Sequence, residues 1–261
     1  MSYNLIILKL NIYLFTFYFI KELFTYNYKR EFILIEKGIL KGAPRKEENW
    51  KRIKFGEPFK KALDRFRENV QNRNDLDPTS LLQFGLFMSI AVINILKENE
   101  TKFGIEGQKA VNDALIKTGY EIGRQIAENT EIPSDISDIE LMSFLATIIN
   151  TQAWTSIEDP IIDNKDKCSF NILWCPLQDI YSAFDCRVQR YLVQGIINYF
   201  RDKILKTEFQ VEFKQTIPAG ATHCRFIIER KKSGEQDKWE TYSKLLERKV
   251  LKRLKERQKN S

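Results

Sequence analysis

The sequence lacks most of the short motifs by which an enzyme class is usually recognised. It has no Gly-rich phosphate loop, no HExxH motif, no CxxC pair and no internal repeat. It contains a single histidine, His223. A zinc site in this chain would therefore have to be rich in cysteine or share its ligation with carboxylates.

Cysteine is also scarce, and its distribution is uneven. The four cysteines all lie in the second half of the chain, at positions Cys168, Cys175, Cys186 and Cys224. In a long chain without a clear export signal, four such residues indicate free thiols, metal ligands or catalytic groups rather than a disulfide framework.

The chain is long enough and apolar enough to bury a sizeable core. Its 261 residues are 43% hydrophobic, and its net charge is +7 with a pI near 9.1. A net positive charge can indicate binding to nucleic acid or to an anionic membrane, or it can reflect only the Lys-rich surfaces common to a whole proteome. The last is favoured because the charge is spread over many segments. We expect no specific nucleic-acid binding.

Residues 1–30 form an apolar segment that we set apart from the fold. The apolar run over residues 5–24 approaches the length of a membrane helix, although Lys9 and Asn11 interrupt it. Basic residues follow the run, so an anchor here would leave the main body in the cytoplasm. The alternatives are a misassigned start and a terminal helix that packs on the protein or on a partner.

Residues 31–150 predict a helical region. Asp77 and Pro78 are typical of a helix start, as cap and first helical residue. Gly119 and Gly123 share one helix face and predict close packing against another element. Residues 42–56 look like a linker, and apolar spacing predicts helices over 58–70, 79–97, 105–129 and 137–149.

Residues 151–231 predict a compact module of strand, strand, helix, strand and strand. Alternation and β-propensity place the strands at about 152–157, 168–174, 209–217 and 224–228, with a helix over about 185–203. Residues 232–261 predict a basic amphipathic helix, which could dock on the body, pair with a partner or touch acidic lipid. The fold class is therefore α+β, and we expect residues 31–231 to form one globular unit.

Four reactive side chains fall at the ends of these predicted elements. Cys175 closes a strand, Cys186 opens the helix, and His223 and Cys224 begin the last strand. A thiol at a helix N-terminus has its thiolate favoured by the helix dipole, which lowers its pKa. The imidazole could act as a general base or share a metal with the thiolates. Alternatively, these residues only pack in the core.

The segment 216–226, TIPAGATHCRF, resembles the signature of the L-2-amino-thiazoline-4-carboxylate hydrolase family. Cys175-Pro176 and Cys186 are similar to that family's paired cysteines around a helix start. The predicted helix over 105–129 is similar to its helical first half. The resemblance covers about residues 100–231. Two positions depart from the pattern, with Ala221 or Thr222 in place of an acidic residue and Arg225 where Asp is common.

The resemblance implies a hydrolase that opens a cyclic amidine C–N bond. It implies Cys186 or Cys224 as nucleophile, His223 as proton carrier, and Arg187 or Arg225 as the anchor for a substrate carboxylate. A metal, with zinc as the candidate, would draw on Cys175, Cys186, His223 and Cys224.

A second interpretation is a non-catalytic binding module. The same layout is similar to four-vinyl-reductase-like domains, which sense small molecules and assist protein assembly. In that case the cysteines line an apolar pocket or hold a structural metal. The partners expected from the sequence are a small-molecule ligand or substrate, a membrane through residues 5–24, and a second copy of the chain as a homodimer.

Overall fold

The computed structural model describes residues 54–132 and 134–259, which belong to one compact unit over Ala43–Ser261. The apolar segment 1–30, with its predicted anchor over 5–24, lies outside the described residues. So does most of the predicted linker over 42–56.

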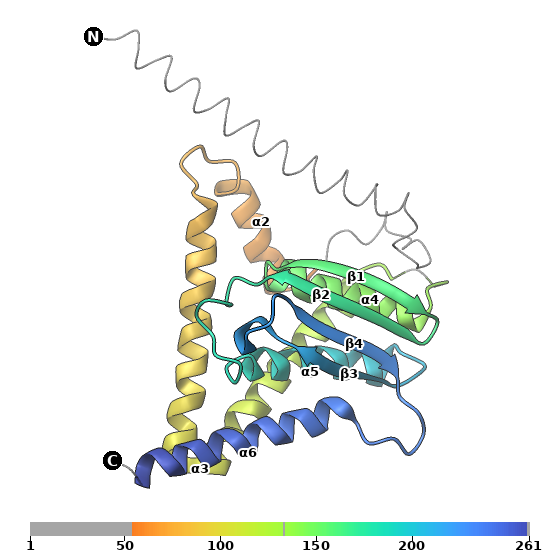
Figure 1. The fold of residues 1–261 in the computed structure, drawn as a ribbon. Coiled ribbons are helices and arrows are strands. Elements are labelled where there is room, and N and C mark those ends of the chain that lie inside the picture. The colour runs from red at the N-terminus through yellow and green to blue at the C-terminus, as the bar shows by residue number, and fades with distance from the viewer. Residues whose placement is uncertain (1–53, 133, 260–261) are drawn as a thin grey trace, which may run out of the picture. The chain divides into compact units, whose positions relative to one another are not determined.

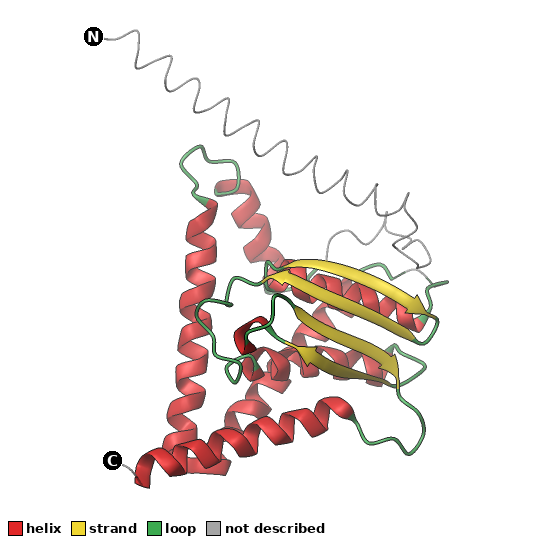
Figure 2. Cartoon of the chain, in the orientation of Figure 1, coloured by secondary structure: helices red, strands yellow, loops and turns green. Residues whose placement is uncertain are grey.

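Helices and a single antiparallel sheet make up the described chain (Figure 2). The α+β class predicted from the sequence is confirmed, with helices first, then the sheet module, and a helix at the C-terminal end (Figure 1). In chain order the elements are α2 (Phe59–Asn69), α3 (Pro78–Asn129), α4 (Asp138–Ile148), η2 (Ile149–Ala153), β1 (Ile157–Asn164), β2 (Lys167–Trp174), α5 (Arg187–Lys203), β3 (Phe209–Gln215), η3 (Ile217–Ala219), β4 (Cys224–Arg230) and α6 (Lys238–Lys259).

The longest helix, α3, is two helices joined at a sharp bend. Its start is as predicted, since the Asp77 side chain accepts a hydrogen bond from the Thr79 amide and Pro78 is the first helical residue. Gly104 interrupts the helix with φ 58° and ψ −127°, a conformation that suits glycine alone. The helices predicted separately over 79–97 and 105–129 are therefore the two arms of α3.

The second arm of α3 packs against α5 with almost no space between the two backbones. A Cβ added at Gly119 would lie 1.9 Å from the carbonyl oxygen of Leu192, and one at Gly123 would lie 2.9 Å from that of Ile196. From the α5 side, a Cβ at Gly195 would lie 2.0 Å from the carbonyl oxygen of Ile116. The close packing predicted from Gly119 and Gly123 is confirmed, and it fixes how α5 lies beneath the sheet.

The sheet has the strand order β1-β2-β4-β3, and each neighbouring pair is antiparallel. The strand predicted over 152–157 is wrong, because residues 149–153 form a π-helical turn and β1 begins at Ile157. Pro160 lies inside β1, and this is tolerated because β1 is an edge strand, where a missing N–H can face away from the neighbour.

One face of the sheet packs on helices α4 and α5 and on the start of α6 (Figure 1). The core between them contains Phe170, Val211 and Ile228 from the strands. The C-terminal helix α6 docks on the body, with Trp239, Leu246 and Val250 buried. Docking on the body was one of the alternatives that the sequence left open. The three elements α5, β4 and α6 thereby enclose a small interior space.

Candidate functional site

An apolar cavity of about 130 Å³ lies between the sheet and α4, α5 and α6. A volume of this size is close to that of an engineered protein cavity that binds benzene. Most of the side chains on its wall are apolar, and none of the described residues that line it is Asp, Glu or His. These polar or ionisable residues are Asn150, Ser156, Cys175, Tyr181, Cys186, Gln189, Arg190, Thr216 and Cys224.

Three of the four cysteines line this cavity. Cys175 follows the last residue of β2, Cys186 is the residue that precedes α5, and Cys224 is the first residue of β4. All three are free thiols, and the Cys224 sulfur accepts a hydrogen bond of 3.2 Å from the Ile217 amide. The structure thus brings the ends of three elements to one place. Cys168 is fully buried within β2 and lies elsewhere in the core.

Burial, rather than the helix dipole, dominates the acidity of these thiols. It raises the pKa of Cys186 to about 12, and the two neighbouring thiols add to the effect. Burial also raises the pKa of Cys175 and of Cys224. The lowered pKa expected for a thiol at the start of α5 is therefore wrong, because the cavity wall excludes the solvent that would stabilise a thiolate. The cavity presents neutral S–H groups.

His223 is not among the residues that line the cavity. One ring nitrogen lies 3.1 Å from the Gln215 side-chain nitrogen, and the other lies 3.1 Å from the Thr222 hydroxyl. Adjacent residues point to opposite sides of an extended chain, so a cavity-facing Cys224 leaves its predecessor outside. The structure does not bring the predicted proton carrier to the thiols.

The two arginines predicted to anchor a substrate carboxylate also lie outside the cavity. Arg187 is buried in an ion pair with Glu100, at 2.6 Å, and donates to the carbonyl oxygen of Phe184. Arg225 donates to the Asn171 side chain at 3.1 Å. Neither arginine is among the residues that line the cavity.

No cluster of three or more His, Cys, Asp or Glu side chains that could hold a metal ion occurs among the described residues. The four residues predicted as metal ligands are all described. The cavity is lined by three of them, Cys175, Cys186 and Cys224. Together with His223 they do not form such a cluster.

The charged group that does line the cavity is Arg190, which the sequence reasoning missed. Its side chain is 4% exposed and lies one helical turn after Cys186, on the same side of α5. Its Nη2 atom donates to the carbonyl oxygen of Trp239 at 2.9 Å and to the Ser243 hydroxyl at 2.5 Å. The guanidinium carbon also lies 4.8 Å from the centre of the Tyr242 ring. A charged residue four positions after Cys186 was the available sequence signal.

Two nitrogens of this guanidinium have no hydrogen-bond partner. Arg190 Nε and Nη1 are buried and unpaired, and so is Nε2 of the adjacent Gln189. Burial lowers the pKa of Arg190 to about 10, which still leaves the guanidinium charged at neutral pH. A buried charge with free N–H groups is costly unless an acceptor meets it. The cavity wall therefore has unpaired hydrogen-bond donors and no acidic side chain that could accept their hydrogen bonds.

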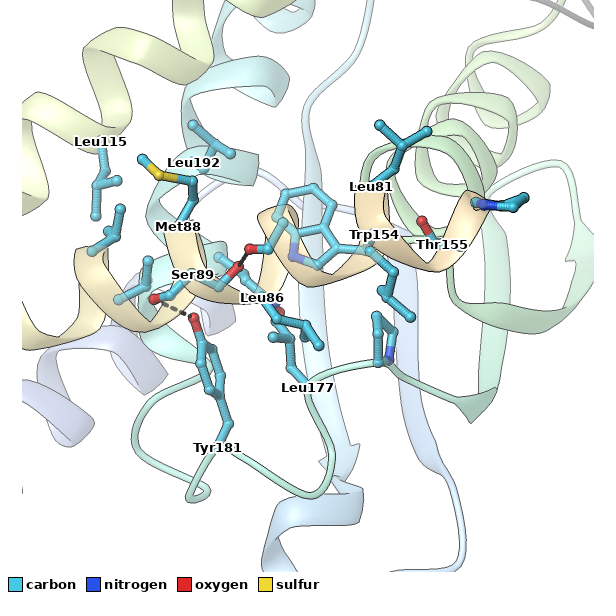
Figure 3. A pocket seen from close by; sticks show the side chains of 17 residues that line it. Leu81, Leu86, Met88, Ser89, Leu115, Trp154, Thr155, Leu177, Tyr181 and Leu192 are labelled. Carbon is cyan, nitrogen blue, oxygen red and sulfur yellow. Dashed lines mark hydrogen bonds between the residues drawn. The ribbon is translucent and has the colours of Figure 1, made fainter. Parts of the chain in front are cut away.

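A larger groove of about 600 Å³ lies beside the cavity (Figure 3). The first arm of α3 forms one wall, and α5 and the loop after β2 form the other. The Tyr181 hydroxyl donates to the carbonyl oxygen of Ser89 at 3.1 Å and so ties the two walls together. The residues from α3 that line the groove are Pro78, Leu81, Leu82, Gly85, Leu86, Met88, Ser89, Val92 and Leu115.

The first arm of α3 exposes large apolar side chains on its outer side. Phe84 and Phe87 are 66% and 67% exposed, and Ile95 is 54% exposed. By length and composition alone, α3 is the one helix in the described part of the chain that could cross a membrane, and 11% of its most apolar window is buried. Core helices of soluble proteins meet the same criteria.

These features define an α+β domain with an apolar interior cavity. One buried arginine and three neutral thiols line this cavity. Residues 83–228 match the family described as L-2-amino-thiazoline-4-carboxylic acid hydrolase, and the chain belongs to this family. The resemblance seen in segment 216–226 is thereby confirmed at the level of the family.

Other known proteins are similar to this chain over most of their own length. An uncharacterized protein of Archaeoglobus fulgidus is 45% identical over 212 residues, which cover 79% of this chain and 94% of the relative.

Two solved structures resemble the fold more distantly. A trafficking protein particle complex subunit 3 from Naegleria fowleri, covalently bound to palmitic acid, is 11% identical, covers 58% of this chain and 98% of its own, and has a TM-score of 0.39. The phenol-responsive sensory domain of the transcription activator PoxR, solved with phenol, is 14% identical, covers 60% and 81%, and has a TM-score of 0.42.

Proposed function

We propose that this protein binds a small carboxylate that carries a flat ring, within the interior cavity, and that Arg190 is its anchor. The observation that carries the proposal is the buried guanidinium with two unpaired nitrogens at the wall of an otherwise apolar space. A carboxylate supplies a charged acceptor oxygen for either free nitrogen of the guanidinium.

Charge balance supports an anionic ligand over a neutral one. No described cavity-lining residue is an Asp or Glu, and the nearby Glu247 is engaged with the Tyr191 hydroxyl and the Asn112 amide. The groups in direct contact with the Arg190 guanidinium are aromatic rings and neutral oxygens, and the Glu247 carboxylate acts on its charge without a hydrogen bond to it. An incoming carboxylate would add a counter-charge in direct contact, in a site with little water, where the attraction is strong.

Size supports a ring of five or six atoms. The cavity volume of about 130 Å³ accommodates a benzene-sized group but no large polar molecule. The wall around it includes Trp154, Phe213 and Phe226, whose apolar surfaces suit a flat ring.

The direct test compares benzoate with benzyl alcohol by isothermal titration calorimetry. Arg190→Met should weaken benzoate binding by about 10- to 100-fold, the range expected for lost hydrogen bonds to a charged group, and leave the alcohol unchanged. Arg225→Met is the matched control, because Arg225 lies outside the cavity and should not affect either ligand. Equal benzoate affinities in wild type and Arg190→Met would contradict the proposal.

Hydrolysis of a cyclic amidine in the same cavity is the second candidate. This candidate is favoured because Cys186 and Cys224 line the same cavity as Arg190. The substrate itself would supply the base: the amidine nitrogen takes the proton of the thiol while the sulfur bonds to the amidine carbon. The ring C–N bond then breaks with its electron pair on nitrogen, and water releases the product and restores the S–H group.

Turnover of 2-amino-thiazoline-4-carboxylate tests this second candidate. If a thiol is the nucleophile, one of the single variants Cys224→Ser and Cys186→Ser, and the double variant, should lose turnover, while benzoate still binds. His223→Gln should retain activity, since its ring lies outside the cavity. Full activity of the double cysteine variant would exclude thiol chemistry and leave the binding function standing.

A further inference from the structure

The interior cavity and the outer groove share part of their walls. Four side chains line both spaces, namely Trp154, Leu177, Tyr181 and Gln189. The groove, at about 600 Å³, is several times larger than the cavity, at about 130 Å³. Figure 3 shows three of these four, Trp154, Leu177 and Tyr181, labelled among the groove side chains.

The two spaces differ in chemistry. The cavity has spare hydrogen-bond donors from Arg190, whereas the groove is bordered chiefly by aliphatic side chains such as Leu82, Leu86 and Leu192. The Tyr181 hydroxyl is already engaged with the Ser89 carbonyl oxygen, so it does not compete for a ligand. Nε2 of Gln189 is buried and unpaired at the partition itself. One end of the combined space suits an anion, and the other suits a hydrocarbon.

We infer that the cavity and the groove form one ligand site, and that its ligand is an aryl carboxylate with an apolar extension. This inference rests on the proposed carboxylate-binding function. The carboxylate lies against Arg190 and the ring fills the cavity. The extension passes between the shared side chains into the groove, where Gln189 offers its free amide N–H to an acceptor at the passage. A groove volume between about 300 and 1,000 Å³ is typical of small-molecule sites.

The occupant is a small molecule rather than a partner helix, because the groove shares a wall with a cavity that is too small for a helix. Gly85 offers a way to test this without touching the cavity. It lies in α3 and lines the groove but not the cavity. A Cβ added there meets no atom within 4 Å. A large side chain at this position would fill the groove while the helix stays intact.

The experiment measures Kd for benzoate, 4-ethylbenzoate, 4-butylbenzoate and 4-hexylbenzoate with the full chain. In the wild type, each added methylene that enters the groove should tighten binding by about fourfold. Gly85→Phe should remove that gain for the longer members and leave benzoate unchanged. Gly85→Ala is the matched control, with the same change of backbone freedom but an open groove, and should retain the gain.

Three outcomes would overturn the inference, and they separate it from the proposed function. Affinities that do not depend on tail length, with benzoate binding still sensitive to Arg190→Met, would leave the cavity site and exclude the groove. A length dependence that Gly85→Phe does not alter would place the tail elsewhere. If 4-hexylbenzyl alcohol binds as tightly as 4-hexylbenzoate and only Gly85→Phe weakens it, the groove is a separate apolar site and the carboxylate anchor fails.

Discussion

The guanidinium carbon of Arg190 lies 4.6 Å from the centre of the Trp239 ring, and its Nη2 atom donates to the carbonyl oxygen of the same residue. One residue of α6 therefore contacts the arginine through both its ring and its backbone. The helix that follows the sheet module thus sets the position of the only arginine on the described cavity wall.

Trp239→Leu should weaken benzoate binding by up to about thirtyfold. The substitution removes the ring that holds the guanidinium, and a cation–π contact away from solvent is worth about 2 kcal/mol. Trp239→Phe keeps an aromatic face and should stay within about threefold of the wild type. Calorimetry on the three proteins checks this, and equal losses in both variants would show that the ring does not position Arg190.

The cavity thiols should resist alkylation in the folded protein. Burial raises the pKa of Cys186 to about 12, so at pH 8 its thiolate fraction is on the order of a thousandfold lower than that of a free cysteine. Iodoacetamide labelling of Cys186, followed by mass spectrometry, should be slow at pH 8 and should accelerate with pH without a plateau below pH 11. Protein unfolded in urea is the control, and a plateau near pH 8 would contradict the expectation.

The same shift links folding stability to pH. The thiol of Cys186 keeps its proton up to about pH 12 when folded, but only to near its ordinary value when unfolded. The native state thus binds more protons across this window, and stability falls as the pH rises through it. Between pH 8 and pH 10, urea unfolding should show a loss of about 1 kcal/mol more in the wild type than in Cys186→Ala.

Gly195→Ala should be strongly destabilising, although alanine is the better helix former. The added Cβ would lie 2.0 Å from the carbonyl oxygen of Ile116, so α3 and α5 would have to separate. We expect a loss of about 3 kcal/mol, at the upper end of overpacking effects. Gly85→Ala, where the new Cβ meets no atom within 4 Å, should instead gain about 0.5 to 1 kcal/mol. Chemical denaturation of the pair tests both signs.

Glu100→Gln should cost about 3 kcal/mol, because it removes the carboxylate that pairs with the buried Arg187 guanidinium and leaves Asp185, at 3.9 Å, as the nearer remaining counter-charge. Both partners are at most 1% exposed. Asp113→Asn breaks an ion pair with Lys109 on the exposed surface and should cost less than about 1 kcal/mol. Equal losses of unfolding free energy in the two variants would mean that the buried ion pair stabilises the protein no more than the exposed one.

Local patterns in the sequence were sufficient for most of the fold. Spacing of three and four residues predicted the helices, and alternation predicted β3 and β4. The first strand was misplaced because Gln152–Ile157 has strand-like composition, whereas the chain there forms a π-helical turn before Pro160 joins the edge strand. The break between the helices predicted over 79–97 and 105–129 is present as the bend at Gly104.

The candidate site was harder to predict, for a physical reason. The cysteines were found because they fall at element ends, which are visible along the chain. Arg190 becomes a cavity residue only when α6 packs against α5, and no local pattern encodes that contact. His223 and Arg187 were predicted as site residues together with the cysteines next to them, yet neighbours in a chain do not face the same way.

The division of the site between two parts of the chain has an evolutionary consequence. Most of the groove's α3 wall comes from residues 78–92, and the wall that carries Arg190 and the thiols comes from residues 175–239. Substitutions in the first arm of α3 can therefore reshape one end of the site while the other end stays constant. In this chain, the length of ligand that the groove accepts can therefore change without any change in the residues that surround Arg190.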